Sequence, residues 1–337
     1  MNLVEISALP KYAELLTRSD APPGSTWGLF GPGDQIGTLN LISKDARIAA
    51  ARAIETGEAF SLDLRSDAIA TSLAPTRRPL SHHIFQRNAF HRDEWLDSVF
   101  TQYGSQIDGL RHIGHPDYGF YNGYDPAAFE PGTEQLGIHQ FSRAGIAGRG
   151  VLIDIARYME SRGQSIDHEA GQAIPIEIVE AARVAQGVDI EPGDIVLLRF
   201  GWLEYYREVA SPETRASLVR VQRHTGILQS KEAVAWLWDN RISLIAADNF
   251  ALECWPARSD SPFYTVEEIE TGDHGVHGGI MHRAIIPLLG MSIGELWDLD
   301  ALASACAADR RYTFLLTLAP LRIVGGVGSP ANAVAIR

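Results

Sequence analysis

Short runs of apolar and β-branched residues recur along the chain, separated by polar and turn-forming stretches. Their apolar character is continuous rather than alternating, which is typical of strands buried on both faces of a sheet. The runs that we interpret as strands are residues 150–156, 194–200, 242–247 and 312–323.

Helical patterns fall between these runs. Residues 175–186 begin with a proline suited to a first turn, residues 231–240 place their apolar side chains on one side, and residues 299–308 are rich in alanine. Helices interleaved with buried strands are typical of an α/β domain. No linker, charge block or repeat marks a boundary, so we expect one elaborated domain over residues 1–337, with residues 1–40 as its N-terminal arm.

Long stretches without helical or strand periodicity are rich in Pro, Gly, His or acidic residues. They are residues 71–93, 118–133 and 257–279, which we predict to be irregular. Loops of this length in a compact domain usually serve as lids, binding loops or oligomer contacts.

Composition narrows the classes of partner. The chain has 29 basic and 42 acidic side chains, a formal net charge of -13, which disfavours nucleic acid and anionic membrane surfaces as partners. No stretch approaches the ~18 to 20 uninterrupted apolar residues of a membrane helix, and residues 1–20 lack a signal-peptide pattern, so we expect a cytoplasmic location. Cys254 and Cys306 are too few for a disulfide framework, and we expect both to be buried.

A first group of polar residues lies between positions 102 and 112. In an extended chain Gln102, Gln106 and Asp108 share one face, and Gly109 permits a turn that brings His112 toward the same pocket. Asp108 would then ligate a metal or orient a base, and His112 would move protons near neutral pH. The alternative is a polar rim, in which His112 bonds a carbonyl oxygen and Asp108 caps a turn.

A second group contains His282 and, later in the chain, Glu295. An Asp/His/Glu set with open positions suits first-row divalent metals. Alternatively, Ser292 and Glu295 fit a capping box at the start of a helix. We expect the nearby His274 and His277 to face solvent.

A third group, residues 246–253, ends a predicted buried strand. Its polar side chains Asp248 and Asn249 could line a ligand crevice at the end of the strand or simply form the turn. Both interpretations stay open at this point.

Together these groups resemble the cyclase family of metal-dependent hydrolases, which includes bacterial kynurenine formamidase and isatin hydrolase. The family signature is His-x-Gly-Thr-His-x-Asp-x-Pro-x-His. Here the matching positions are Gly104, Asp108 and His112, Ser105 stands for Thr, and the departures are Gln102, Gln106 and Leu110. Further segments similar to the family occur before and after this signature, in the same order as in the family. They are residues 27–28, 37–40, 193–194, 201–202 and 325–330.

The resemblance implies a swivelling β/β/α architecture, a homodimer or homotetramer, and a divalent metal. It places Asp108, His282 and Glu295 as metal ligands, with Gln106 as a further ligand, and His112 as the proton-transfer group. A glutamine offers a carbonyl oxygen but no imidazole nitrogen, which lowers affinity for zinc and relatively favours harder ions such as manganese. We therefore expect manganese or zinc.

The same resemblance, to a long-form branch with Gln-x-x-Ser/Thr-Gln-Trp-Asp in this place, puts Tyr121 and Asn122 near the pocket. We assign these two residues, with Gln102 and the aromatic Trp27, to substrate binding. The expected partner is a small molecule.

The function that this resemblance implies is hydrolysis of a small cyclic or aryl amide, imide or lactone by metal-activated water, with Asp108 and His112 as catalytic residues. A metal-free alternative has His112 activating water while Gln102 or Gln106 donates to the oxyanion. A second alternative is a non-catalytic protein that binds a small metabolite. A ring-closing enzyme is a third, without a residue of its own to support it.

Overall fold

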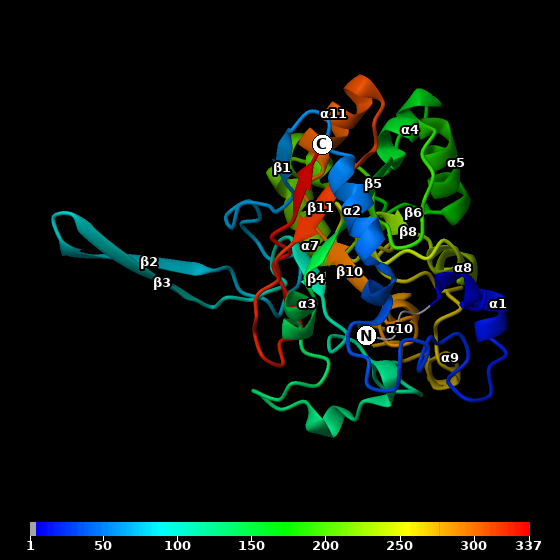
Figure 1. Ribbon diagram of the computed structural model, residues 1–337. Coiled ribbons are helices and arrows are strands. Elements are labelled where there is room, and N and C mark those ends of the chain that lie inside the picture. The colour runs from blue at the N-terminus through cyan, green and yellow to red at the C-terminus, as the bar shows by residue number, and fades with distance from the viewer. Residues whose placement is uncertain (1–4, 276) are drawn as a thin grey trace.

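The computed structural model describes residues 5–275 and 277–337, and its centre is a nine-stranded sheet (Figure 1). The strand order is β1-β13-β11-β5-β7-β9-β10-β4-β12, in which β5, β7, β9 and β10 run parallel and the flanking pairs run antiparallel. The strands are β1 (Ala59–Ser61), β4 (Gln106–Asp108), β5 (Ile146–Asp154), β7 (Ile195–Arg199), β9 (Leu244–Ala247), β10 (Ser292–Glu295), β11 (Thr313–Leu318), β12 (Gly328–Ser329) and β13 (Val334–Ile336).

The four strands expected from apolar runs are confirmed as β5, β7, β9 and β11. Every residue of β7 and β9 is buried, as continuous apolar runs predict. β11 ends at Leu318, earlier than expected, just before Pro320, which has no N–H to donate to a sheet.

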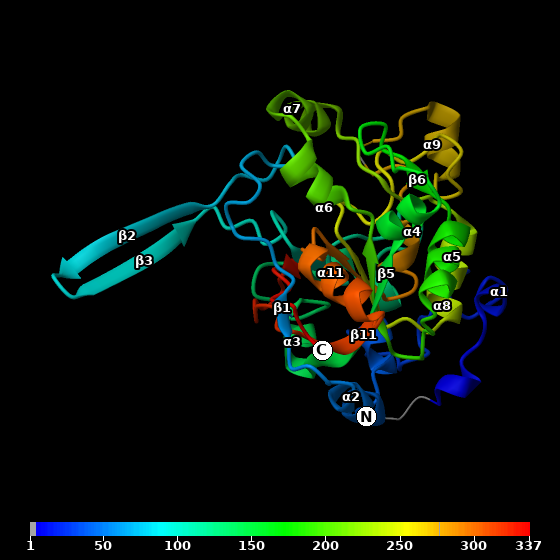
Figure 2. The same cartoon turned by 90° about the horizontal axis from the view of Figure 1, so that it is seen from above.

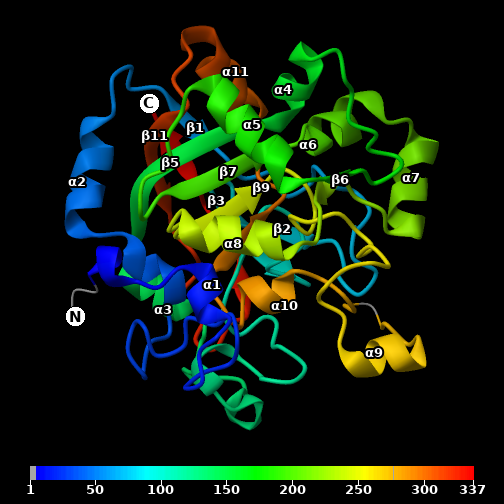
Figure 3. The ribbon, with the colours of Figure 1, turned by 90° about the vertical axis from the view of Figure 1, so that its right-hand side faces the viewer.

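The three expected helices are also confirmed, as α5 (Ile176–Gln186), α8 (Lys231–Asp239) and α11 (Asp300–Asp309). Figure 3 shows α4 (Ile155–Ser161), α5 and α8 side by side over the parallel strands. The remaining α-helices are α1 (Tyr12–Leu15), α2 (Lys44–Arg52), α3 (His139–Ala144), α6 (Trp202–Glu204), α7 (Pro212–Val221), α9 (Val266–Thr271) and α10 (His282–Ile285), and a two-stranded sheet joins β6 (Ala173–Ile174) to β8 (Gly226–Ile227).

The described part of the N-terminal arm packs on the body. The Tyr12 N–H donates to Asp239 Oδ1 at 2.8 Å, and Trp238 Nε1 donates to the Pro10 carbonyl at 2.8 Å. These bonds hold α1 against α8.

Two of the expected irregular stretches contain regular structure. Residues 71–93 include β2 (Ser81–Asn88), which pairs with β3 (His91–Asp97) in a hairpin that projects from the body (Figure 2). Residues 257–279 include α9, which begins at a Thr265–Glu268 capping box. The prediction was wrong there because polar and charged residues dominate both segments. Residues 118–133 are irregular apart from two short 3-10 turns.

Buried apolar side chains fill the space between the sheet and the helices in one large cluster, with a smaller one around Trp202 and Tyr206. The α/β fold class is confirmed. No helix in the described ranges has the length and apolar character needed to cross a membrane.

Candidate metal centre

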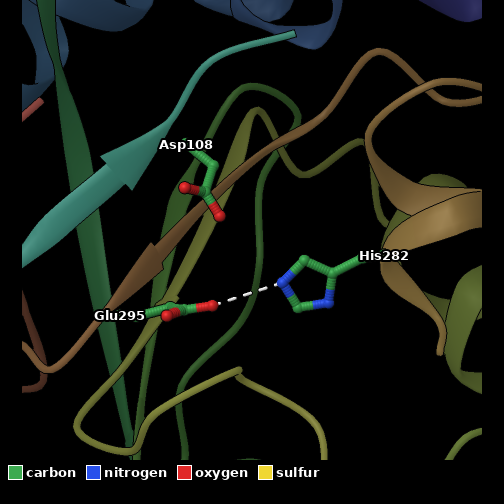
Figure 4. A group of neighbouring side chains, drawn as sticks. All are labelled: Asp108, His282 and Glu295. Carbon is green, nitrogen blue, oxygen red and sulfur yellow. Dashed lines mark hydrogen bonds and ion pairs between the residues drawn. The ribbon is translucent and has the colours of Figure 1, made fainter. Parts of the chain in front are cut away.

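Asp108, His282 and Glu295 converge beside β4 and β10, near the β12 edge of the sheet (Figure 4). Asp108 ends β4 and Glu295 ends β10, and these strands are neighbours in which Gln106 is opposite Glu295. His282 begins α10. One potential ligand atom from each of the three buried residues lies within 4.8 Å of the others. The sheet register therefore brings Asp108 and Glu295 together, and the start of α10 adds His282.

The orientation of His282 is set by a residue without an assigned role in the sequence analysis, Glu253. Its Oε1 lies 2.6 Å from His282 Nδ1 and also accepts the His282 backbone N–H at 3.0 Å, while its Oε2 accepts the Met281 N–H at 2.6 Å. The other ring nitrogen, Nε2, lies 3.2 Å from Glu295 Oε1. A carboxylate that holds one nitrogen of a histidine and turns the other toward a ligand position is a common support of metal sites.

Two glutamines brace the carboxylates. Gln102 Nε2 donates to Asp108 Oδ1, and Gln106 Nε2 donates to Glu295 Oε2 at 2.5 Å. Arg77 holds the glutamines in turn, since its guanidinium donates to the Gln102 carbonyl and to Gln106 Oε1, the latter at 3.4 Å. The contacts of Gln106 support a positioning role, and its role as a ligand stays a prediction, as does substrate binding by Gln102.

His112 lies at the edge of this cluster. Its N–H donates to the Gly109 carbonyl at 3.0 Å, which closes the expected turn, and its Nε2 lies 3.9 Å from Asp108 Oδ1. The His112 side chain is 22% exposed, whereas that of Asp108 is 1% exposed. An imidazole at the boundary between a buried carboxylate and solvent can exchange protons with both.

The electrostatics of the cluster follow from burial and pairing. Burial alone would lower the pKa of His282, but its hydrogen bonds to Glu253 and Glu295 and their charges raise it to about 10. Burial alone would raise the pKa of Glu295, yet the His282 hydrogen bond and charge leave it lowered. Burial raises the pKa of Asp108, and the charge of His112 offsets only part of that shift.

The backbone around the site is strained. Ala251 and Leu252, just before Glu253, have φ of 78° and 58°, and Leu296, just after Glu295, has φ of 56°. Residues with a Cβ rarely adopt such values, and they persist where the surrounding structure enforces them. Here the Leu296 N–H bonds the Asn249 carbonyl at 3.0 Å, and the Leu296 carbonyl accepts from Ser105 Oγ at 2.5 Å.

The donor set fits a divalent cation. It combines two carboxylates with an imidazole nitrogen, and Asp108 Oδ2 is buried with no hydrogen-bond partner among the described residues. A buried carboxylate oxygen left without a partner is costly, and a cation would satisfy it.

The other residues assigned to substrate binding have contacts elsewhere. Trp27 Nε1 donates to the Pro287 carbonyl at 2.6 Å, and Asn122 bonds backbone groups of Gly28, Gly31 and Asp34. The fully buried Tyr121 donates to Asp34 Oδ2 at 3.0 Å. Trp27 and Asn122 line a separate surface pocket of about 500 Å³. These contacts attach the N-terminal segment to the body, and a role of the three residues in substrate binding stays a prediction.

Several alternatives from the sequence are resolved. Residues Ser292–Glu295 form a strand, so the interpretation of Glu295 as part of a helix-capping box is wrong. Asp248 accepts the N–H groups of Phe200, Gly201 and Trp202 at 2.7–3.1 Å, which makes it a support of the turn after β7. Asn249 likewise bonds two carbonyls.

His274 and His277, the two histidines that precede His282, differ in their contacts. His274 and His277 are exposed, as expected, but the His277 ring packs against Trp255 with centroids 5.9 Å apart. Partial burial lowers the pKa of His277, and the charges of His282 and His112 lower it further.

Sequence reasoning missed Glu253 and Arg77. Glu253 belongs to the third polar group, and a carboxylate that follows a buried strand was a usable signal. Nothing in the local pattern distinguishes Arg77 from other arginines. Both cysteines are buried as expected, and burial raises the pKa of each thiol to about 12, which argues against nucleophilic roles.

Comparisons with known proteins agree with the fold. Residues 74–254 match the family model "Cyclase", described as "Putative cyclase". A crystal structure described as that of a novel cyclase is 32% identical and superposes with a TM-score of 0.78, covering 93% of this chain and 99% of that one. A comparison with curated proteins finds no match.

More distant structures share the fold alone. An isatin hydrolase bound to the product analogue thioisatinate is 15% identical, with a TM-score of 0.56 over 87% of this chain and 98% of that one. Isatin hydrolase A from Labrenzia aggregata, bound to benzyl benzoate, is 16% identical, with a TM-score of 0.54 over 82% and 93%. The family model and the 32% identical structure together show that this chain belongs to the cyclase family.

Proposed function

We propose that this protein is a metal-dependent hydrolase that opens a small cyclic or aryl amide, imide or lactone, with Asp108, His282 and Glu295 as ligands of a manganese or zinc ion and His112 as the proton shuttle. The observation that carries the proposal is the buried Oδ2 of Asp108, which no group in the described part of the chain bonds, beside a histidine that Glu253 orients. The substrate class comes from the isatin hydrolases that share the fold.

Each residue of the site would have a distinct role in the proposed reaction. When bound, a divalent ion supplies a Lewis acid that polarises the substrate carbonyl and lowers the pKa of water. Gln102 and Glu253 hold Asp108 and His282 in place through their hydrogen bonds. His112 Nε2 accepts a proton from the attacking water and returns it to the leaving nitrogen or oxygen, a contribution of roughly 10² to 10⁴-fold for a placed acid–base group.

The metal-free alternative has less support. It needs amide donors directed at an oxyanion, but one N–H of each of the Gln102 and Gln106 amides already donates to Asp108 or Glu295, which leaves each amide only its second N–H and fixes its orientation. A non-catalytic binding protein would have no need to keep four titratable groups at one site. These groups are Asp108, His112, His282 and Glu295. No separate residue supports a ring-closing enzyme.

The test is the metal content of protein purified without chelator, measured by mass spectrometry of the elements. We expect about one equivalent of manganese or zinc in wild type and less than about a tenth in Asp108→Asn, since a lost ligand weakens the site strongly. His112→Gln should keep the metal and lose turnover of an amide and lactone panel by at least about 100-fold. His91→Gln, on the projecting hairpin, is the matched control and should change neither.

Two results would contradict the proposal. One is wild-type protein without metal whose turnover survives a chelator, which favours the metal-free mechanism. The other is metal-loaded wild type that binds panel compounds without converting them, which favours a binding protein.

A further inference from the structure

Arg77 bonds the residues of the candidate metal centre through only one of its nitrogens. Nη1 donates to the backbone carbonyl of Gln102 and, at 3.4 Å, to Oε1 of Gln106, whose amide nitrogen donates to Glu295. One side-chain amide therefore separates Arg77 from a predicted metal ligand. A guanidinium has five N–H donors, and these two bonds use the two on Nη1. The donors on Nε and Nη2 bond no group in the described part of the chain.

The two nitrogens left open form the edge that binds carboxylates elsewhere in this chain. Nε and Nη2 of Arg149 donate to the two oxygens of Asp194 at 2.9 and 2.8 Å. The same two atoms of Arg183 donate to the two oxygens of Glu180 at 2.9 and 2.7 Å. Two parallel N–H groups match the spacing of two carboxylate oxygens, which makes such pairs strong and specific. Arg77 has the same edge but, within the described ranges, no carboxylate on it.

The guanidinium of Arg77 is held in place before any ligand binds. Its Cζ lies 5.8 Å from the centroid of the Phe250 ring, within the range of a cation–π contact, and its Nη1 is fixed by Gln102 and Gln106. Arg77 and Phe250 are both partly exposed, so a ligand can reach them. A flat apolar wall beside a positioned cation suits a cyclic or aromatic compound that carries an anionic group.

Balancing the charge of the buried acids does not by itself explain the contacts of Arg77. A cation that served only this purpose would be most stabilising in direct contact with a carboxylate, as in the two arginine pairs above. Instead Arg77 bonds two neutral amide oxygens, which a glutamine or lysine side chain would also satisfy. The positive charge and the open edge of the guanidinium therefore remain for a group outside the chain.

We propose that Arg77 binds a carboxylate of the substrate and so selects an anionic member of the proposed substrate class. The substrate is then a small cyclic or aryl amide, imide or lactone that carries a carboxylate apart from the carbonyl that is attacked. This carboxylate lies on Nε and Nη2 of Arg77, its ring lies toward Phe250, and the carbonyl faces the candidate metal centre. The inference rests on the proposed function, because it assigns the substrate of the same site.

The product of such a reaction supplies probes that need no turnover. Hydrolysis of a cyclic amide or lactone leaves a new carboxylate where the carbonyl was, so the product carries two carboxylates on one scaffold. The three isomers of benzene dicarboxylate present such a pair at different separations, and benzoate presents a single carboxylate. By calorimetry on protein purified without chelator, at least one isomer should bind about 10-fold or more tightly than benzoate, as expected for a charge-assisted bidentate bond.

Substitution of Arg77 tests which residue causes this preference. Arg77→Gln should abolish the preference for a dicarboxylate, because the amide has neither the charge nor the fork, and Arg77→Lys should keep only part of it. Arg78→Gln, at the neighbouring exposed arginine, is the matched control and should keep the wild-type preference. Dicarboxylates that bind wild type no more tightly than benzoate, or a preference that survives in Arg77→Gln, would overturn the proposal.

A kinetic test separates carboxylate recognition from the bracing of the metal ligands. It compares phthalide and phthalimide with derivatives that carry a carboxylate at each ring position in turn. Arg77→Gln should lower the ratio of kcat/KM between the best carboxylate compound and its parent by about 10-fold or more, chiefly through KM. An equal loss on both compounds would show that Arg77 only braces Gln102 and Gln106. That result, or a wild type that prefers the uncharged parents, would overturn the proposal.

Failure of the hydrolase proposal gives a different result from failure of this one. A wild type that hydrolyses none of these compounds contradicts the hydrolase proposal. The dicarboxylate titrations of wild type and Arg77→Gln still decide in that case whether Arg77 binds a carboxylate, because they measure affinity and not turnover.

Discussion

The metal centre and the projecting hairpin use the same types of side chain in opposite surroundings. Both combine carboxylates with histidine or arginine at hydrogen-bond distance. At the centre, the Glu253 and His282 side chains are 0% and 5% exposed, whereas Arg87 and Asp93 of the hairpin are 58% and 41% exposed. Breaking a buried pair leaves an uncompensated charge, while water replaces an exposed partner at little cost. Burial, and not the number of ion pairs, decides how much each network contributes to the free energy of unfolding.

The strongest test of this contrast is Glu253→Ala. It removes the acceptor of His282 Nδ1 and of two backbone N–H groups, so we expect a loss of about 3 to 5 kcal/mol in the free energy of unfolding. Urea denaturation of protein freed of metal measures it. Glu253→Gln keeps an acceptor oxygen and should lose less. A loss below about 1 kcal/mol for the alanine variant would show that the buried network behaves like a surface pair.

His224 sharpens the comparison because its ring is buried and, within the described ranges, no group bonds either ring nitrogen. Its side chain is fully buried between Trp202 and Phe250, and neither ring nitrogen has a hydrogen-bond partner among the described residues. Burial lowers its pKa from 6.5 to about 4. The unfolded chain therefore binds this proton more readily below pH 6.5, and stability falls as pH drops from 6.5 toward 4.

The variant His224→Phe removes this effect. The free energy of unfolding of the wild type should fall by about 2 kcal/mol between pH 7 and pH 5 because of this residue. The variant should lack this part of the dependence of unfolding free energy on pH. Urea denaturation across this pH range measures the difference, which is insensitive to any constant packing cost of the larger ring. His91→Phe, at an exposed position, should keep the wild-type slope. An unchanged slope in His224→Phe would mean that His224 is not the residue responsible.

The smallest effect is expected on the hairpin. Arg87→Ala breaks the exposed pair with Asp93 and should change the free energy of unfolding by less than about 1 kcal/mol, with even less effect at high salt. The same denaturation measurement, at low and high salt, gives the value. A loss as large as that of Glu253→Ala would mean that the pair is desolvated, as it would be inside an interface.

Local pattern was sufficient for much of the fold. The buried strands β5, β7 and β9 and the helices α5, α8 and α11 were predictable because an apolar run or a helical stripe has few other ways to be buried. The hairpin was not predictable, since β2 and β3 pair through residues as polar as those of a loop.

For the site, the sequence by itself determined the identity of the chemical groups. The spacing of Asp108 and His112, the later His282 and Glu295, and the resemblance of these segments to the cyclase family identified a set of potential ligands and a proton-transfer group. Only the tertiary structure decided how they meet, because β4 reaches β10 through pairing between segments distant in the chain. That pairing also turned Gln102 and Gln106 into braces and brought in Glu253 and Arg77, whose roles depend on contacts that no local spacing encodes.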